Sequence, residues 1–139
     1  MISSPEKHLV SACLMGLCTR YDGRCNPNKS CINFLAGHHW IPVCPEQLGG
    51  LATPRTPADL VGGDGHDVLA GRAAVIDANG LDVSSQFIRG ARQALTIAQA
   101  QHITTALLKS RSPSCGLGDP VGVTAALLLE NNITCREFG

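Results

Sequence analysis

Apolar residues along this chain form short blocks separated by turn-forming residues, and the period within each block predicts its secondary structure. Four short blocks bounded by such residues indicate buried strands. These predicted strands are residues 7–14, 40–43, 103–108 and 133–135. Blocks with helical spacing or helix-terminating signals predict three helices. These predicted helices are residues 28–36, 82–100 and 122–130.

The middle of the chain is harder to assign. Residues 49–65 are rich in Gly and Pro and predict a long irregular loop, and loops of this length in a small domain are often functional. Residues 68–69 and 73–76 predict two short strands that form a hairpin at the edge of the sheet.

Strands and helices therefore alternate along the chain. This order predicts an α/β fold, Rossmann-like or flavodoxin-like, with a mainly parallel sheet flanked by helices. The 139 residues contain no internal repeat, and we expect a single compact domain spanning residues 1–139.

Composition narrows the choice of partner. Lys and Arg total 11 and Asp and Glu total 11, so the formal net charge is zero and no strong binding to nucleic acid is expected. A small-molecule substrate is favoured instead. No signal peptide or membrane-spanning stretch is recognisable, so we expect a soluble, cytoplasmic protein with no membrane association. The sequence leaves the oligomeric state open.

Three of the seven cysteines, Cys13, Cys44 and Cys115, each follow a predicted strand and open into a turn. Ligands at the carboxyl ends of parallel strands meet at one edge of the sheet. Thiolates select zinc, copper(I) or iron–sulfur clusters. The cysteines are dispersed, with four residues between even the closest pair, Cys13 and Cys18, which argues against a zinc ribbon. Three thiolates can hold a cluster and leave one iron open for chemistry.

The remaining candidates for metal binding carry weaker signals. Cys18, Cys25 and Cys31 lie near one another in sequence, and a second metal site there is a minor alternative. Cys135 is expected in the core. The pair His38–His39 is expected at the surface, at the end of a helix, with metal ligation again a minor alternative.

Several ordered motifs resemble one protein family. They are Ser11-Ala12-Cys13-Leu14, Arg20-Tyr21-Asp22-Gly23, Pro42-Val43-Cys44-Pro45-Glu46, Pro54-Arg55 and Ser112-Pro113-Ser114-Cys115-Gly116. The chain resembles the DUF523 family, whose characterised members are TudS-like thiouracil desulfidases. The loop after Gly116 is shorter than is usual in that family, which puts any substrate contact it makes in question.

The resemblance implies a [4Fe–4S] cluster held by Cys13, Cys44 and Cys115. It further implies a non-redox hydrolysis that removes sulfur from 2- or 4-thiouracil-like bases or nucleosides. Glu46 and Ser112 match the catalytic residues of the family. We expect Glu46 to transfer a proton, since it lies two residues from a ligand.

We also single out residues for substrate binding. They are Arg20, Tyr21, Asp22, Arg55, Lys109 and Ser114. Two other functions stay open at this point: a metal- or small-molecule-binding module without turnover, and a thiol redox protein that uses Cys13.

Overall fold

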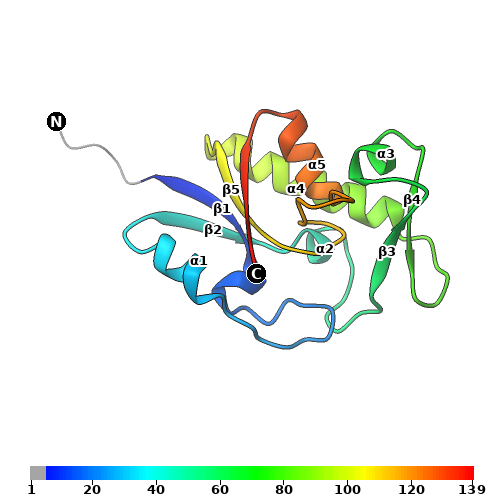
Figure 1. Cartoon of the computed structure of the whole chain (residues 1–139), viewed down its shortest axis with the longest axis horizontal. Coiled ribbons are helices and arrows are strands. Elements are labelled where there is room, and N and C mark those ends of the chain that lie inside the picture. The colour runs from blue at the N-terminus through cyan, green and yellow to red at the C-terminus, as the bar shows by residue number, and fades with distance from the viewer. Residues whose placement is uncertain (1–5) are drawn as a thin grey trace.

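The centre of the protein is a four-stranded parallel sheet. The computed structural model describes residues 6–139, and Figure 1 shows its elements. The strands lie in the order β2 (His39–Val43), β1 (Lys7–Ser11), β5 (Thr105–Lys109) and β6 (Thr134–Phe138). This is the beginning of the flavodoxin-like order, in which the chain adds strands first on one side of β1 and then on the other. The predicted α/β fold with a mainly parallel sheet is therefore confirmed.

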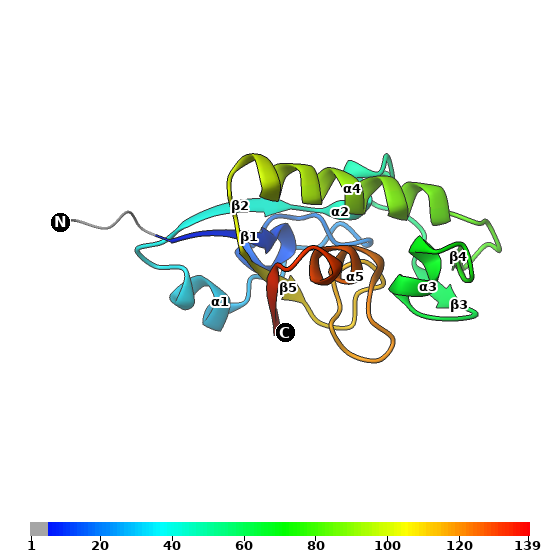
Figure 2. The same ribbon diagram turned by 90° about the horizontal axis from the view of Figure 1, so that it is seen from above.

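Helices cover both faces of this sheet. Helices α4 (Ser84–Ala100) and α5 (Val123–Glu130) pack on one face through small residues, among them Ala94, Ala98 and Ala125. Helix α1 (Lys29–Phe34) covers the other face, where Cys31 and Leu35 contact Val10 and Leu107. Figure 2 shows α4 along one side of β1 and β2, with α1 on the other side.

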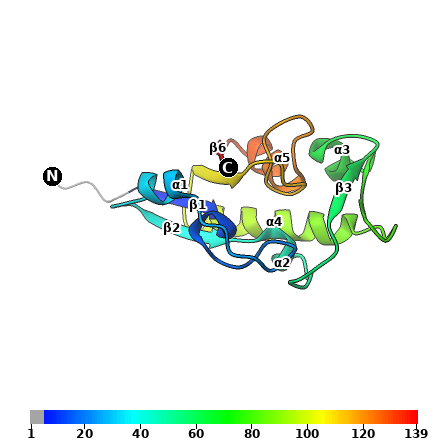
Figure 3. The same ribbon diagram turned by 60° about the horizontal axis from the view of Figure 1, so that its bottom comes forward.

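A small subdomain lies at the end of the molecule opposite α1, as Figure 3 also shows. It comprises the antiparallel hairpin of β3 (Ala58–Val61) and β4 (Ala74–Asp77) and the short helix α3 (Gly65–Leu69). Its apolar residues Val68 and Val75 pack against Phe87 of α4 and Val123 of α5.

The prediction for this subdomain was partly wrong. Residues 68–69 belong to helix α3, not to a strand, because Asp64 and Asp67 form a capping box that starts the helix. The hairpin partner of β4 is β3, which lies inside the segment that was expected to be irregular. Four residues with alternating exposure are too short a pattern to stand out among glycines and prolines.

Two local differences from prediction affect the site. The strand expected over residues 7–14 stops at Ser11, and Ala12–Met15 form a 3-10 helix, η1, that ends at Gly16 with φ of +89°. The short helix α2 (Pro45–Leu48) was not predicted; it begins at Pro45, whose fixed φ suits the first helical position.

The described residues contain no helix that is both long and apolar enough to cross a membrane.

Candidate active site

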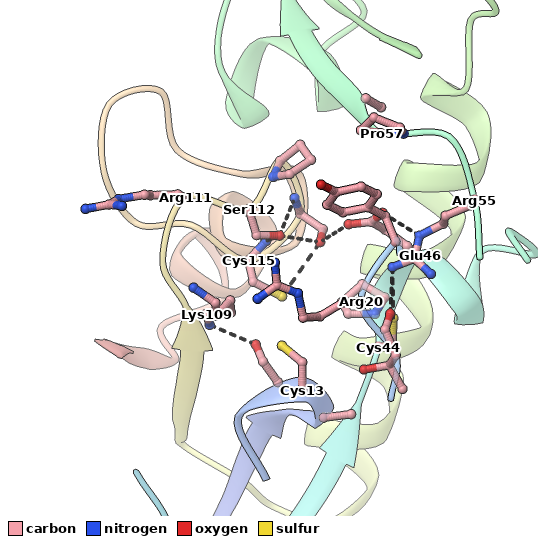
Figure 4. A pocket seen from close by; sticks show the side chains of 18 of the residues that line it. Cys13, Arg20, Cys44, Glu46, Arg55, Pro57, Lys109, Arg111, Ser112 and Cys115 are labelled. Atoms are coloured by element: carbon pink, nitrogen blue, oxygen red, sulfur yellow. Dashed lines mark hydrogen bonds and ion pairs between the residues drawn. The ribbon is translucent and has the colours of Figure 1, made fainter. Parts of the chain in front are cut away.

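A cavity of about 530 Å³ opens where β1, β2 and β5 end (Figure 4). It lies beyond the carboxyl ends of the strands, next to the point between β1 and β5 where the direction of strand addition reverses. Crevices at such switch points are where open α/β sheets bind ligands. The strand order alone thus determines where the cavity lies.

All three of the singled-out thiols line this cavity. Cys13 lies on η1 directly after β1, Cys44 directly follows β2 as the residue before α2, and Cys115 lies in the turn after β5. Within residues 6–139 they do not form a set whose ligand atoms all lie within 4.8 Å of one another. The set is therefore not a compact site for one small ion, and three soft donors on one cavity fit the chemistry of an iron–sulfur cluster.

The surroundings of Cys13 and Cys115 do not favour the free thiolate. Burial raises the pKa of Cys115 to about 12. Burial also raises the pKa of Cys13, although the Lys109 ammonium acts in the opposite direction. Reactive redox cysteines have lowered pKa values instead. A thiol with a raised pKa still releases its proton when its sulfur binds a metal.

Glu46 lies on α2 and projects toward the same cavity (Figure 4). Its Oε1 accepts a hydrogen bond from Nε of Arg55 at 2.9 Å, and its Oε2 accepts one from the hydroxyl of Ser114 at 3.0 Å. The two side chains of this ion pair are only 15% and 8% exposed, so water screens it weakly. The pair fixes the position of the carboxylate.

Arg55 is held by several further acceptors. It donates to the carbonyl oxygens of Thr19 and Ala52 and to the hydroxyl of Thr53, and its Nη2 lies 3.8 Å from the sulfur of Cys44. The N–H groups of its guanidinium are therefore engaged by protein atoms. Arg55 also lines the cavity, and its role in substrate binding stays a prediction.

Ser112 organises the turn that carries Cys115. Its Oγ accepts hydrogen bonds from the backbone N–H groups of Ser114 at 3.2 Å and Cys115 at 3.0 Å. The hydroxyls of Ser112 and Ser114 are 3.0 Å apart. With Ser114 donating to Glu46, Ser112 is the donor to Ser114, so a chain of hydroxyls ends on the carboxylate.

The start of α5 holds this turn in place. The N–H groups of Val123 and Ala125 donate to the carbonyl oxygens of Pro113 and Ser114. Gly122 makes the close approach possible, because a Cβ there would lie only 2.6 Å from the carbonyl carbon and oxygen of Ser114. A glycine is needed at this position for lack of space and not for its dihedral angles.

A second close approach positions α2. Gly49 at the end of α2 faces Gly90 of α4, and a Cβ on either glycine would overlap backbone atoms of the opposite segment. The backbone of α2 therefore rests directly on α4. This contact sets the depth at which Cys44 and Glu46 enter the cavity.

Charged and aromatic residues complete the lining. Arg20, Tyr21, Lys109 and Ser114 all line the cavity as expected from the sequence. Asp22 does not line it; its carboxylate lies 3.7 Å from Nε of Arg20 and orients that side chain. Tyr21 is 44% exposed.

The sequence reasoning missed several lining residues, notably Ser11 and Arg111. Ser11 is the last residue of β1, and its Oγ accepts a hydrogen bond from the N–H of Lys109. Arg111 lies in the turn after β5 with φ of +59°. Their position after strands that end at the cavity was the signal that could have found them.

The remaining cysteines lie elsewhere. Cys18 and Cys25 form a disulfide, and Cys31 is buried against Val10, so in this structure the three residues do not form the second metal site that was the minor alternative. Cys135 packs against the core beneath α4 and α5, as expected.

Comparison with known proteins identifies the family of this chain. A family model described as 2-thiouracil desulfurase matches residues 9–137. The uncharacterized protein YbbK of Bacillus subtilis (strain 168) is 39% identical, with 86% of this chain and 87% of that protein covered. The solved structure of the [4Fe-4S]-dependent thiouracil desulfidase TudS (DUF523Vcz) is 38% identical, with a TM-score of 0.80 over 95% of this chain and 90% of that one. The chain belongs to the 2-thiouracil desulfurase family, also called DUF523.

Proposed function

We propose that this protein is a [4Fe–4S]-dependent desulfidase that hydrolyses the thiocarbonyl group of 2- or 4-thiouracil-like bases or nucleosides. The observation that carries the proposal is the convergence of three thiols and a fixed carboxylate on one cavity. Its volume lies within the range of small-molecule sites. Family membership and the likeness to TudS support the same activity.

Cys13, Cys44 and Cys115 would hold the cluster. When bound, a cluster with three cysteine ligands supplies an open iron position that acts as a Lewis acid toward sulfur. Overall, the thiocarbonyl compound and water give the carbonyl compound and hydrogen sulfide, with no change in oxidation state. The three thiols come from separate strand ends, so the sheet holds them apart at fixed positions.

Glu46 accepts the proton of the attacking water in this proposal. A general base of this kind contributes typically about 10²- to 10⁴-fold to the rate. Hydrogen bonds from Arg55 and from the hydroxyl of Ser114 hold and orient the carboxylate. Ser112 serves the mechanism by fixing Ser114 and the backbone of Cys115.

The substrate contacts are proposed from the lining. Arg20 and Lys109 offer cationic donors to the oxygen and nitrogen atoms of a pyrimidine ring, and Tyr21 offers an aromatic wall. Asp22 contributes through Arg20. Arg55 acts as a positioning residue for Glu46.

We further propose a cytoplasmic location and one domain over residues 1–139. In a reducing compartment the disulfide of Cys18 and Cys25 would open, because glutathione and thioredoxin keep thiols reduced there. The absence of net charge supports a small-molecule substrate over a nucleic acid. A thiol redox protein is disfavoured, since the pKa values of Cys13 and Cys115 are raised.

The test is anaerobic purification, iron and acid-labile sulfide analysis, and incubation with 2- and 4-thiouracil while released sulfide is measured. We expect about four irons per chain and sulfide release. A protein that binds zinc alone, or that carries the cluster and releases no sulfide from any thiolated pyrimidine, would contradict the proposal.

Glu46→Gln tests the role of the base. We expect this variant to keep its iron and lose about 10²- to 10⁴-fold in turnover. Glu130→Gln is the control, because Glu130 pairs with His66 at the surface. Full activity of Glu46→Gln at normal iron content would remove Glu46 from the mechanism.

A further inference from the structure

A second group of metal-ligating side chains lies at the amino ends of the strands, away from the thiol cavity. Ligand atoms of Glu6, His8 and His38 all lie within 4.8 Å of one another. Nε2 of His8 is 2.8 Å from Nδ1 of His38 and 3.6 Å from Oε2 of Glu6. In Figures 1 and 2 this is the end where β1 begins and the chain passes from α1 into β2.

The sheet register explains why these residues meet. Parallel pairing of Lys7 with His39 places His38 beside Glu6, and the alternation of side chains along β1 puts Glu6 and His8 on the same face. His39 then points to the opposite face of the sheet. Strand pairing thus brings the backbones of Glu6, His8 and His38 together.

His8 is held as a ligand would be. It is buried, with 2% of its surface exposed, and its Nδ1 lies 2.5 Å from Oγ1 of Thr105 on the neighbouring strand β5. When Nδ1 donates to Thr105, the lone pair of Nε2 faces Glu6 and His38. Metal-ligating histidines almost always use their second nitrogen in this way, which fixes the ring and its tautomer.

The surroundings of His8 favour its neutral form. Burial lowers the pKa of His8, and the nearby His38 lowers it further, while Glu6 raises it. The ring of Phe34 packs against both imidazoles, with ring centres 5.8 Å from His8 and 5.7 Å from His38. A neutral imidazole is the form that binds metal.

We propose that Glu6, His8 and His38 bind a Zn²⁺ ion. Two imidazoles and one carboxylate are a donor set that zinc uses, and water would fill the fourth position. The set lacks sulfur, so it differs in chemistry from the thiol cavity. The ion would tie the start of β1 to the turn before β2, and the proposal does not depend on the desulfidase function.

The first experiment is titration of tag-free protein with Co²⁺, a spectroscopic substitute for Zn²⁺. We expect the difference spectrum between the wild type and His38→Ala to show the ligand-field bands of one Co²⁺ per chain and no sulfur-to-cobalt charge-transfer band. The absence of that band from the difference spectrum separates this site from Co²⁺ bound by the thiols of the cavity. His38→Ala should lose this signal, and His39→Ala, the matched control on the neighbouring residue, should keep it.

Replacement of the buried His8 could unfold the protein, so two further variants leave His8 in place. Glu6→Gln should weaken Zn²⁺ binding in a competition assay with a chelator. Thr105→Val keeps all three ligands and should weaken it about 10- to 100-fold, as loss of an outer-shell partner does. Zinc should raise the melting temperature of the wild type and of His39→Ala by more than that of His38→Ala, in which the thiol cavity is unchanged.

The result that overturns the proposal is a Co²⁺ spectrum and Zn²⁺ affinity that are the same in His38→Ala and the wild type. Absence of any sulfur-free cobalt signal in the folded wild-type protein would overturn it equally. In that event the two histidines form only a hydrogen-bonded pair.

Discussion

Gly122→Ala offers a quantitative test of how the cysteine turn is held. A Cβ at this position would lie 2.6 Å from the carbonyl carbon and oxygen of Ser114 and 2.9 Å from the oxygen of Pro113. Ordinary carbon–carbon contact is about 3.5 Å, so the turn and α5 must separate by about 0.9 Å. That movement stretches the hydrogen bonds from Val123 and Ala125 and displaces Ser114 and Cys115.

The expected effect on stability has three parts. Overpacking costs about 1–3 kcal/mol. Alanine at the residue that caps α5 is about 0.5–1 kcal/mol worse than glycine. The lower entropy of the unfolded chain offsets about 0.4–1 kcal/mol. The net loss is about 2 kcal/mol, which at about 4 °C per kcal/mol for a chain of this size lowers the melting temperature by about 8 °C.

Function should fall further than stability. A misplacement of about 1 Å can cost about 10²-fold in rate, so sulfide release should drop by about that factor at temperatures where the variant is folded. The assays are calorimetric or urea unfolding for stability, with iron content and sulfide release for the site.

Gly118→Ala is the matched control in the same loop. Nothing lies within 4 Å of a Cβ at Gly118, so this variant should unfold like the wild type. If Gly122→Ala is as stable and as active as Gly118→Ala, the contact between α5 and the cysteine turn does not hold the site, and the reasoning is refuted.

Three other outcomes are expected. Cys13→Ser should lose iron while Cys135→Ser, outside the cavity, keeps it; a normal iron content in Cys13→Ser would rule that residue out as a ligand. Burial raises the pKa of Cys31 from 9.0 to about 11, so between these values the unfolded chain binds fewer protons than the folded one and stability should fall with rising pH, by up to about 3 kcal/mol. Cys31→Ala should make this slope shallower in urea unfolding at pH 8 to 11 without abolishing it, because burial also raises the pKa of Cys115 and Cys135; an unchanged slope would show that Cys31 does not contribute. Removal of the disulfide by Cys18→Ser should lower stability by about 2–3 kcal/mol, as expected for a short loop, when compared with oxidised wild type, and by little under reduction; equal stability of the oxidised wild type and the variant would show that the disulfide does not form.

The outline of the protein was readable from local patterns. The regular spacing of Phe87, Ala91, Ala94 and Ala98 predicted α4, and the apolar blocks predicted the parallel strands, because one-sided burial imposes its period on the chain. Cys13, Cys44 and Cys115 were predicted to share one edge of the sheet, since each follows a strand, and all three line the cavity.

Other features depend on contacts between segments that are distant in the chain, and local patterns carry no record of them. The hydrogen bonds that join Glu46 to Arg55 and Ser114 bring helix α2 together with two different loops, so neither the contacts of Arg55 nor the burial of the pair was visible beforehand. The approach of Gly122 to Ser114 is likewise set by how α5 docks.

The residue order of this chain thus specifies which elements form and which side chains stand at their ends, because propensity and hydrophobic period act over a few residues. The assembled fold alone specifies which of those ends become neighbours and at what distance. It pairs Cys18 with Cys25, and through the strand register it brings His38 to Glu6 and His8. Packing between whole helices and strands sets these separations, and a difference of one ångström in that packing is enough to make or abolish a site.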